Sequence, residues 1–408
     1  MRAMTAPDSS YTFGIEEELF LVDPVSRCAV TRMPKRFLSD CRRELGERIG
    51  RELLQSQIEI VSPVFADAAE AAATMTDLRR RLAGVACRHG LRVLAAGTQP
   101  MTAWRSQAVS PKERYARLLD DYQILGLRNL VCGLHVHVGV PASVDRVRVM
   151  NRLLPWLPVF LALSASSPFW SRQSTGLHSY RQAAYDEWPR TGIPDAFEDQ
   201  ADYDAFADLL ERSGAIESRQ SLWWAIRPSH RFPTLELRIA DSCTRLDDAL
   251  ALATLYRCLV HAHVEDPALG RATGSAAVLR RLADENRWRA KRHGVAADFI
   301  DAAGSRRDIA ALLDQAEPWL RRSAEALGVA DVLGPVRAIL IRGSSADRQL
   351  AIYRDARDGG AGRIEALHAV VDWLIAASLP APGLSRAGHP DDDSDGPRHT
   401  APATAAVP

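Results

Sequence analysis

The chain has 408 residues, 47% of them hydrophobic, which is enough to bury one large core or two cores of ordinary size. Lys and Arg total 51, as do Asp and Glu, so the balanced charge gives no general attraction to nucleic acid or to an acidic membrane surface. Six scattered cysteines without a Cys-x-x-Cys pair are typical of free thiols in a reducing compartment, and we expect a cytoplasmic protein.

The two ends of the chain differ in composition from its middle. Residues 1–10 contain no apolar segment typical of a signal peptide, and we expect them to be flexible. Residues 379–408 are rich in Pro, Gly, Asp and Ala and predict a disordered tail, because they offer little to bury. A single domain is expected over residues 11–378.

The first predicted strand, over residues 11–23, carries three consecutive glutamates. Side chains alternate between the two faces of a strand, so Glu16 and Glu18 share one face. Glu17 falls on the opposite face, among apolar side chains. The strand is therefore expected to present two carboxylates on its polar face.

The second predicted strand, over residues 55–63, repeats this pattern. It places Gln57 and Glu59 on one face and isoleucines on the other. A helix is predicted directly after it, over residues 66–90, from its long amphipathic pattern.

The third predicted strand, GLHVHVGV over residues 133–140, holds two histidines two positions apart. His135 and His137 point to the same face, while Leu134 and Val136 point to the other. Such a pair alone is more often part of an ordinary half-buried strand than of a catalytic site.

The most apolar stretch of the chain covers residues 149–168. Arg152, Pro155 and Pro158 interrupt it, so it falls short of the roughly 20 apolar residues of a membrane span. It predicts a buried helix that begins near residue 143.

The fourth predicted strand, over residues 233–241, places Glu236 and Arg238 on its polar face. A helix follows, which opens with Thr244 and Asp247 in the spacing of a capping box. The last third of the chain, roughly residues 270–378, reads as helical almost throughout.

These elements lack the regular alternation and Gly-rich turns of a doubly wound fold, and they favour an α+β class with an antiparallel sheet. The sequence contains neither a GxGxxG motif nor a Walker A motif, so any nucleotide is held in another way.

If the four strands share one sheet, their polar faces form one surface with at least four carboxylates, two imidazoles and an arginine. Carboxylates side by side repel one another, and each is pushed toward its protonated form. A divalent cation relieves this crowding, and oxygen-rich sites with few nitrogens suit Mg²⁺ or Mn²⁺. The repeated pattern therefore predicts a metal site, although each strand alone could have a merely solvated face.

Several segments together resemble the successive motifs of the YbdK-type carboxylate–amine ligases, which belong to the glutamate–cysteine ligase type 2 group. The matching segments are FGIEEELFLVDP, QSQIEIVSP, CGLHVHVGV, SYRQAAYDEWPRTG and RPSHRFPTLELRIADS, followed by ENRWRAKRHG and RGSSADRQL. The resemblance runs from about residue 11 to about residue 376, in order and without large gaps.

This resemblance implies a glutamine-synthetase-like fold, an open antiparallel sheet with helices packed on one face. It implies a catalytic domain that uses ATP and Mg²⁺ (or Mn²⁺) to form an amide bond through an acyl phosphate, with release of ADP and phosphate. The implied substrates are a glutamate-like carboxylate and a cysteine-like amine, with weak glutamate–cysteine ligase activity and a possible homodimer.

The resemblance also implies roles for individual residues. Those that would hold the metal ions are Glu16, Glu18, Glu59, His135 and Glu236. Arg238 would face the transferring phosphoryl group and, with Glu59, would be catalytic. Arg181, in a polar loop with aromatic neighbours, and Arg227 are candidates for binding substrate. His137 either hydrogen-bonds substrate or orients a carboxylate, or it is structural.

Two other function classes stay open from the residues alone. A metal-dependent hydrolase could use the same Glu/His face to activate water without ATP, although it would call for a site richer in nitrogen ligands and the chain lacks HExxH spacing. A non-catalytic binding protein could retain the fold, but retention of the whole acidic and imidazole set disfavours it.

Overall fold

The computed structural model describes residues 10–269 and 275–379. Within these residues seven strands form one sheet in the order β2-β3-β1-β5-β9-β8, and β4 pairs with the C-terminal end of β1. Every pairing in this sheet is antiparallel. The expected α+β class with an antiparallel sheet is confirmed. The predicted flexible segments, 1–10 and 379–408, lie outside the described residues except for Ser10 and Leu379.

The four predicted strands are present as β1, β3, β5 and β9. The strands of the sheet are β1 Phe13–Val22, β2 Ile49–Arg51, β3 Gln57–Val61, β4 Arg92–Leu94, β5 Gly133–Gly139, β8 Ile226–Pro228 and β9 Thr234–Asp241. Two short hairpins are formed by β6 Phe169–Trp170 with β7 Gln173–Ser174, and by β10 Asp298–Ile300 with β11 Arg306–Asp308.

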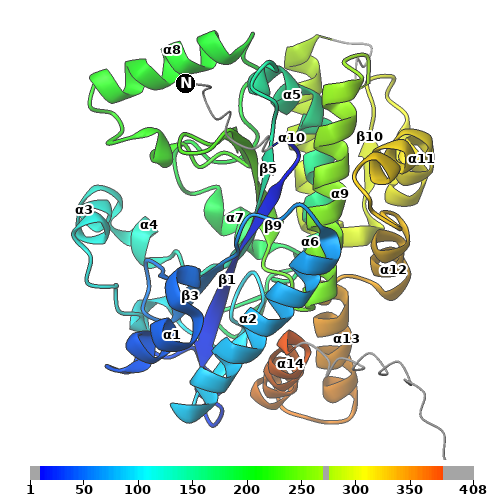
Figure 1. Cartoon of the computed structure of the whole chain (residues 1–408). Coiled ribbons are helices and arrows are strands. Elements are labelled where there is room, and N and C mark those ends of the chain that lie inside the picture. The colour runs from blue at the N-terminus through cyan, green and yellow to red at the C-terminus, as the bar shows by residue number, and fades with distance from the viewer. Residues whose placement is uncertain (1–9, 270–274, 380–408) are drawn as a thin grey trace, which may run out of the picture.

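The helices of the described residues fill the connections between these strands and most of the C-terminal part (Figure 1). They are α1 Phe37–Leu45, α2 Ala68–Arg88, α3 Glu113–Tyr122, α4 Ile124–Leu127, α5 Arg146–Leu153, α6 Leu157–Ser164, α7 Tyr180–Tyr185, α8 Gln200–Arg212, α9 Leu246–Glu265, α10 Ala276–His293, α11 Ile309–Ala326, α12 Gly334–Arg342, α13 Ser345–Asp358 and α14 Arg363–Ser378. None of them is both long enough and apolar enough to cross a membrane.

One face of the sheet is apolar and is covered by helices. Ile15, Ile58, Val136 and Leu237 come from four neighbouring strands and are buried in the same core. Figure 1 shows α2, α6 and α9 along this side of the sheet, with α3, α4 and α8 toward the other side. The apolar face is buried against helices, so the opposite, polar face is free to form a site.

Three sequence expectations about helices need correction. The capping box at Thr244 is wrong: α9 begins after Arg245 without a side-chain cap, and the Thr244 hydroxyl instead hydrogen-bonds Ser345. The single helix near residues 149–168 is two helices joined by a 3-10 turn, because Pro155 and Pro158 lack the N–H that a continuous helix needs. The helical C-terminal third is interrupted by the β10–β11 hairpin.

The pairing between β5 and β9 contains a β-bulge. Leu134 pairs with Ala240 and Val136 pairs with Leu237, so two residues of β9 lie opposite His135. One of these two is Arg238. Bulges re-aim side chains and are frequent beside active sites, and this one lies at the centre of the polar face.

Glu17 lies on the buried side of β1, as its position in the alternation predicts. Its carboxylate accepts two hydrogen bonds from Arg79 of α2, at 2.8 and 2.6 Å, and both side chains are almost fully buried. The guanidinium of Arg79 also donates to the backbone carbonyls of Cys243, Thr244 and Ser378. This ion pair therefore ties the first strand to three other segments.

Loss of Arg79 is expected to destabilise the fold, because it leaves the buried Glu17 charge without its partner. Arg79→Met is expected to lower the free energy of unfolding by about 3–5 kcal/mol in chemical denaturation. Arg27→Met, which removes an exposed ion pair with Asp372, is the matched control and is expected to change it little. Equal effects of the two substitutions would contradict a stabilising role for the buried pair.

Candidate active site

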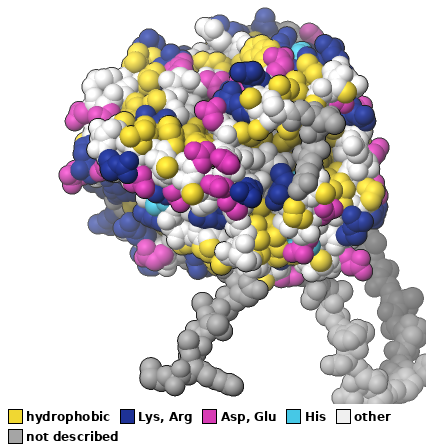
Figure 2. All heavy atoms as spheres, turned by 90° about the horizontal axis from the view of Figure 1, so that it is seen from above, with side chains coloured by type: hydrophobic (Ala, Val, Ile, Leu, Met, Phe, Trp, Pro, Cys, Tyr) yellow, Lys and Arg dark blue, Asp and Glu magenta, His cyan; other side chains and the backbone are white. Residues whose placement is uncertain are grey.

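A cavity of about 400 Å³ opens on the polar face of the sheet. It is lined by all the site residues predicted from the sequence, namely Glu16, Glu18, Glu59, His135, His137, Arg181, Arg227, Glu236 and Arg238. These residues come from β1, β3, β5, β8, β9 and α7. Lys and Arg are interspersed with Asp and Glu over the face seen in Figure 2, so charge of one sign does not dominate that face.

Strand register explains why the side chains of the polar face meet. On β1 and β5, Glu16 lies directly opposite His135. The neighbouring pairings place Glu18 opposite Glu59 and His137 opposite Glu236. Directly opposed residues of an antiparallel pair have Cβ atoms about 4.5–5.5 Å apart, so each pair is close enough for its polar atoms to interact.

Two groups of three side chains have the spacing of metal ligands. One consists of Glu16, His135 and Glu59, and the other of Glu16, His137 and Glu236. Within each group the possible ligand atoms all lie within 4.8 Å of one another. The buried Nε2 atom of His135 has no hydrogen-bond partner among the described residues, as expected of a side chain that a ligand completes. The donor set therefore fits a divalent cation.

Carboxylates crowd the β1–β3 side of the cavity. Burial, together with the charges of Glu52, Glu16 and Glu18, raises the pKa of Glu59 well above its ordinary value. Burial and the neighbouring Glu18 raise the pKa of Glu52 to about 8. These shifts express the cost of burying the two carboxylates and, after it, the repulsion from their charged neighbours, which a cation would relieve.

Glu16 lies between the two histidines and is affected in the opposite direction. Burial alone would raise its pKa, but hydrogen bonds and charge interactions with His135 and His137 lower the pKa overall. Burial and the nearby Arg238 lower the pKa of His135, which favours the neutral imidazole. A neutral imidazole is the form that binds a metal ion.

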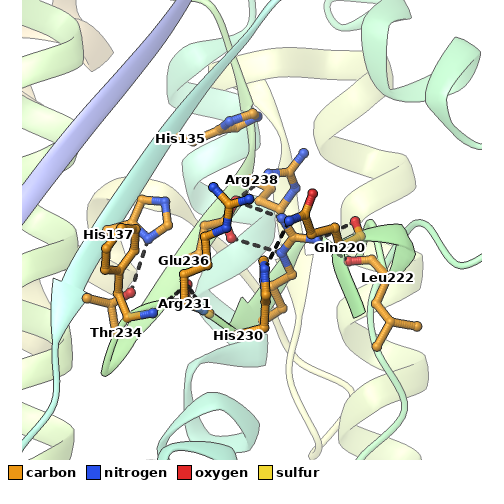
Figure 3. A network of polar contacts seen from close by, with 12 residues as sticks. His135, His137, Gln220, Leu222, His230, Arg231, Thr234, Glu236 and Arg238 are labelled. Atoms are coloured by element: carbon orange, nitrogen blue, oxygen red, sulfur yellow. Dashed lines mark hydrogen bonds and ion pairs between the residues drawn. The ribbon is translucent and has the colours of Figure 1, made fainter. Parts of the chain in front are cut away.

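Glu236 is held by two arginines. Arg227 donates to its carboxylate at 2.8 and 3.3 Å, and the guanidinium of Arg238 also contacts it. Burial opposes ionisation of Glu236, yet Arg238 and Arg227 keep its pKa well below the ordinary value. Figure 3 shows this carboxylate and Arg238 directed into the same space as His135 and His137.

The other predicted substrate ligands differ in how fully they are engaged. Arg227 also donates to the carbonyls of Gln220 and Leu222, so most of its donors already have partners. His137 contacts the Thr234 hydroxyl at 3.1 Å and Glu16 at 3.5 Å. Arg181 lies on the short helix α7 and not in the polar loop expected from the sequence. It is only 2% exposed, and its Nε atom has no hydrogen-bond partner among the described residues.

Several residues that line the cavity are not among the site residues predicted from the sequence. Glu52 lies just beyond the short strand β2, where the sequence has no alternating pattern that would predict its direction. The aromatic walls include Tyr185, Trp188 and Trp223, and Trp188 contacts Trp223 edge to face. The sequence offered only a weak signal for these rings, because clustered aromatic residues are more often core than site.

Comparisons with known proteins agree with this geometry. The sequence pattern of the family described as "Glutamate-cysteine ligase family 2 (GCS2)" matches residues 12–366. A relative from Ectopseudomonas mendocina, named "Putative glutamate--cysteine ligase 2", is 47% identical over 375 residues, which are 90% of this chain and 96% of the relative. A relative of the same name from Bradyrhizobium sp. is 42% identical over 371 residues, 91% of this chain and 88% of the relative.

Two solved structures share the fold. A bifunctional glutathione synthetase from Pasteurella multocida superposes with a TM-score of 0.66 at 15% identity, over 90% of this chain and 52% of that one. A glutamate–cysteine ligase from Francisella tularensis, solved in complex with AMP, superposes with a TM-score of 0.64 at 12% identity, over 91% of this chain and 90% of that one. The architecture expected from the sequence motifs is thus that of known ligase structures.

A test of the cation site follows from the crowding of the carboxylates. Removing the charge at position 59 relieves repulsion in the metal-free protein but deletes a ligand. Glu59→Gln is therefore expected to melt at or above the wild-type temperature without metal, and to weaken binding of Mg²⁺ or Mn²⁺ at least tenfold. Melting temperature against ion concentration measures both effects. Glu285→Gln, an exposed position on α10, is the control. Unchanged ion binding by Glu59→Gln would contradict the assignment.

Proposed function

This chain belongs to the glutamate–cysteine ligase family 2, and on that premise we propose that the cavity on its sheet is where a carboxylate is activated by ATP and joined to an amine. The enzyme is a ligase that forms a carbon–nitrogen bond. The observation that supports the cavity as the site is the convergence of carboxylates, two imidazoles and Arg238 on one face. Within each of the two groups of three possible ligands, the ligand atoms lie within 4.8 Å of one another.

The proposed reaction has two steps. A carboxylate is a poor acyl donor, because its leaving group would be oxide. In the first step an oxygen of the substrate carboxylate attacks the γ-phosphorus of ATP, ADP leaves, and an acyl phosphate forms. The amine nitrogen then attacks the acyl carbon, phosphate leaves, and the nitrogen loses a proton. The protein supplies mainly position and charge for such phosphoryl transfer.

Residues of β1, β3, β5 and β9 would hold the divalent ions, Mg²⁺ or Mn²⁺. The proposed ligands are Glu16, Glu18, Glu59, His135 and Glu236, with Glu52 close to them. Such ions, when bound, neutralise charge on the phosphate oxygens. The N–H of Gly133 donates to Glu18 at 2.6 Å and so fixes one of these carboxylates. Hydrogen bonds of this kind orient ligands before the ion arrives.

Arg238 is proposed to bind the transferring phosphoryl group. It lies partly buried beside Glu236, and its Nε atom has no hydrogen-bond partner among the described residues. A guanidinium placed in this way donates to oxygens as negative charge develops on them. Arg181 is proposed to bind the substrate carboxylate, and His137 to hydrogen-bond substrate or to orient Glu236.

The proposed substrates are a glutamate-like carboxylate and a cysteine-like amine, in keeping with the names of the relatives. The aromatic walls formed by Tyr185, Trp188 and Trp223 would exclude water from the acyl phosphate. Location in the cytoplasm and assembly as a homodimer stay predictions, which fractionation and light scattering would test.

A metal-dependent hydrolase is the alternative that the same Glu/His face could support. Each of the two ligand groups contains one histidine and two carboxylates, which suits Mg²⁺ better than the nitrogen-rich zinc sites of hydrolases. Release of product without ATP would favour this alternative.

The decisive experiment is a screen of carboxylate and amine pairs for ADP release, with mass spectrometry of the products. We expect ADP release that depends on Mg²⁺ and on both substrates, and an amide product that retains both. Glu59→Ala is expected to abolish turnover while far-ultraviolet circular dichroism stays unchanged. Normal turnover by this variant would refute the role of Glu59.

Arg238 offers a second test of the mechanism. Arg238→Lys keeps the charge but loses the planar donor fork, and kcat is expected to fall by roughly 100-fold or more. Arg321→Lys on α11, remote from the cavity, is the control and is expected to leave kcat unchanged. An unchanged kcat in Arg238→Lys would exclude this arginine from the phosphoryl-transfer step.

A further inference from the structure

Gly133 lies on the polar face of β5, in alternation with His135 and His137. A Cβ atom built on this glycine would lie 2.8 Å from the Cζ atom of Arg181 and closer still to its Nη2 atom. Real Cβ atoms essentially never approach other atoms within 3.0 Å. The Arg181 guanidinium can therefore occupy its place only because residue 133 has no side chain.

The main chain of Arg181 is fixed independently of this contact. Its N–H donates to the Ser167 hydroxyl at 3.0 Å, and that hydroxyl donates to the buried carboxylate of Asp241 at 2.6 Å. The next side chain, Gln182, donates to the carbonyl of Ile239 at 2.7 Å. These bonds join the start of α7 to the end of β9, so the guanidinium can move only through its own side-chain rotations.

The guanidinium of Arg181 makes only long hydrogen bonds. Its Nη atoms reach the carbonyls of Arg238 and Ile239 only at 3.4–3.5 Å, and its Nε atom has no hydrogen-bond partner among the described residues. It is nevertheless buried and lines the cavity. A buried cation with long, incomplete hydrogen bonds is suited to bind an anion that enters the cavity.

We propose that Gly133 is a positioning residue that determines where Arg181 binds the substrate carboxylate. This inference rests on the proposed function, which assigns the carboxylate to Arg181. A side chain at position 133 would displace the guanidinium from the place in which it contacts the carbonyls of Arg238 and Ile239. The N–H of residue 133, which binds Glu18, would be retained in any substitution except proline.

The test compares Gly133→Ala with Gly14→Ala in steady-state kinetics. Gly14 also lies on the polar face, on β1, but a Cβ there would meet Ser62 at an ordinary 3.7 Å. We expect Gly133→Ala to raise the KM for the carboxylate at least tenfold while the KM for ATP stays within twofold. Gly14→Ala is expected to change neither. A KM split of this kind would not arise from a general loss of structure.

The double variant Gly133→Ala/Arg181→Ala shows whether the two residues act together. If Gly133 acts through Arg181, the double variant is expected to match Arg181→Ala alone, whereas multiplied effects would overturn the inference. A raised KM in Arg181→Ala with a normal KM in Gly133→Ala would overturn only the role of Gly133. A normal KM in Arg181→Ala would instead refute the carboxylate role that the proposed function gives to Arg181.

The double variant also decides the case in which Gly133→Ala fails to fold. Removing the Arg181 side chain takes away the atoms that the added methyl group would meet. Recovery of a folded protein in the double variant would support the close contact, and continued misfolding would overturn it. Circular dichroism and melting temperature give this readout without any activity.

Discussion

Mutual repulsion among crowded, partly buried carboxylates is the constraint around which this molecule is arranged. Antiparallel register places Glu16, Glu18 and Glu59 on one face of the sheet, and Glu52 lies beside them. A cluster of this kind is tolerated only where histidines, arginines or bound cations offset its charge. Strand β5 supplies the histidines and β9 supplies an arginine. A cation would have to be bound from solution.

On the opposite side of the sheet a buried carboxylate, that of Glu17, is neutralised by an ion pair. Glu17 points away from its two neighbours and is neutralised inside the core by Arg79. Consecutive glutamates on β1 are thus divided between a closed ion pair and an open cavity. The same alternation that makes Glu17 part of the structure makes Glu16 and Glu18 available for chemistry.

Alternation along strands made much of the candidate site predictable, because side-chain direction in a strand depends only on position. On the sequence alone it separates Glu17 from Glu16. It could not reveal Glu52, which follows a three-residue strand, or the importance of Gly133, which depends on an arginine 48 positions further along the chain. The capping box expected at Thr244 does not form, because the Thr244 hydroxyl hydrogen-bonds Ser345. The sequence around Thr244 could not reveal a partner so distant along the chain.

The contacts of Arg79 with several segments have a consequence for local unfolding. Its guanidinium contacts β1, the segment before α9 and the last residue of α14 at once. Fraying of the C-terminal end of α14 must therefore break a contact shared with the central sheet. Amide protons at that C-terminal helix end should exchange with solvent as part of a larger cooperative unit, rather than independently as exposed ends usually do.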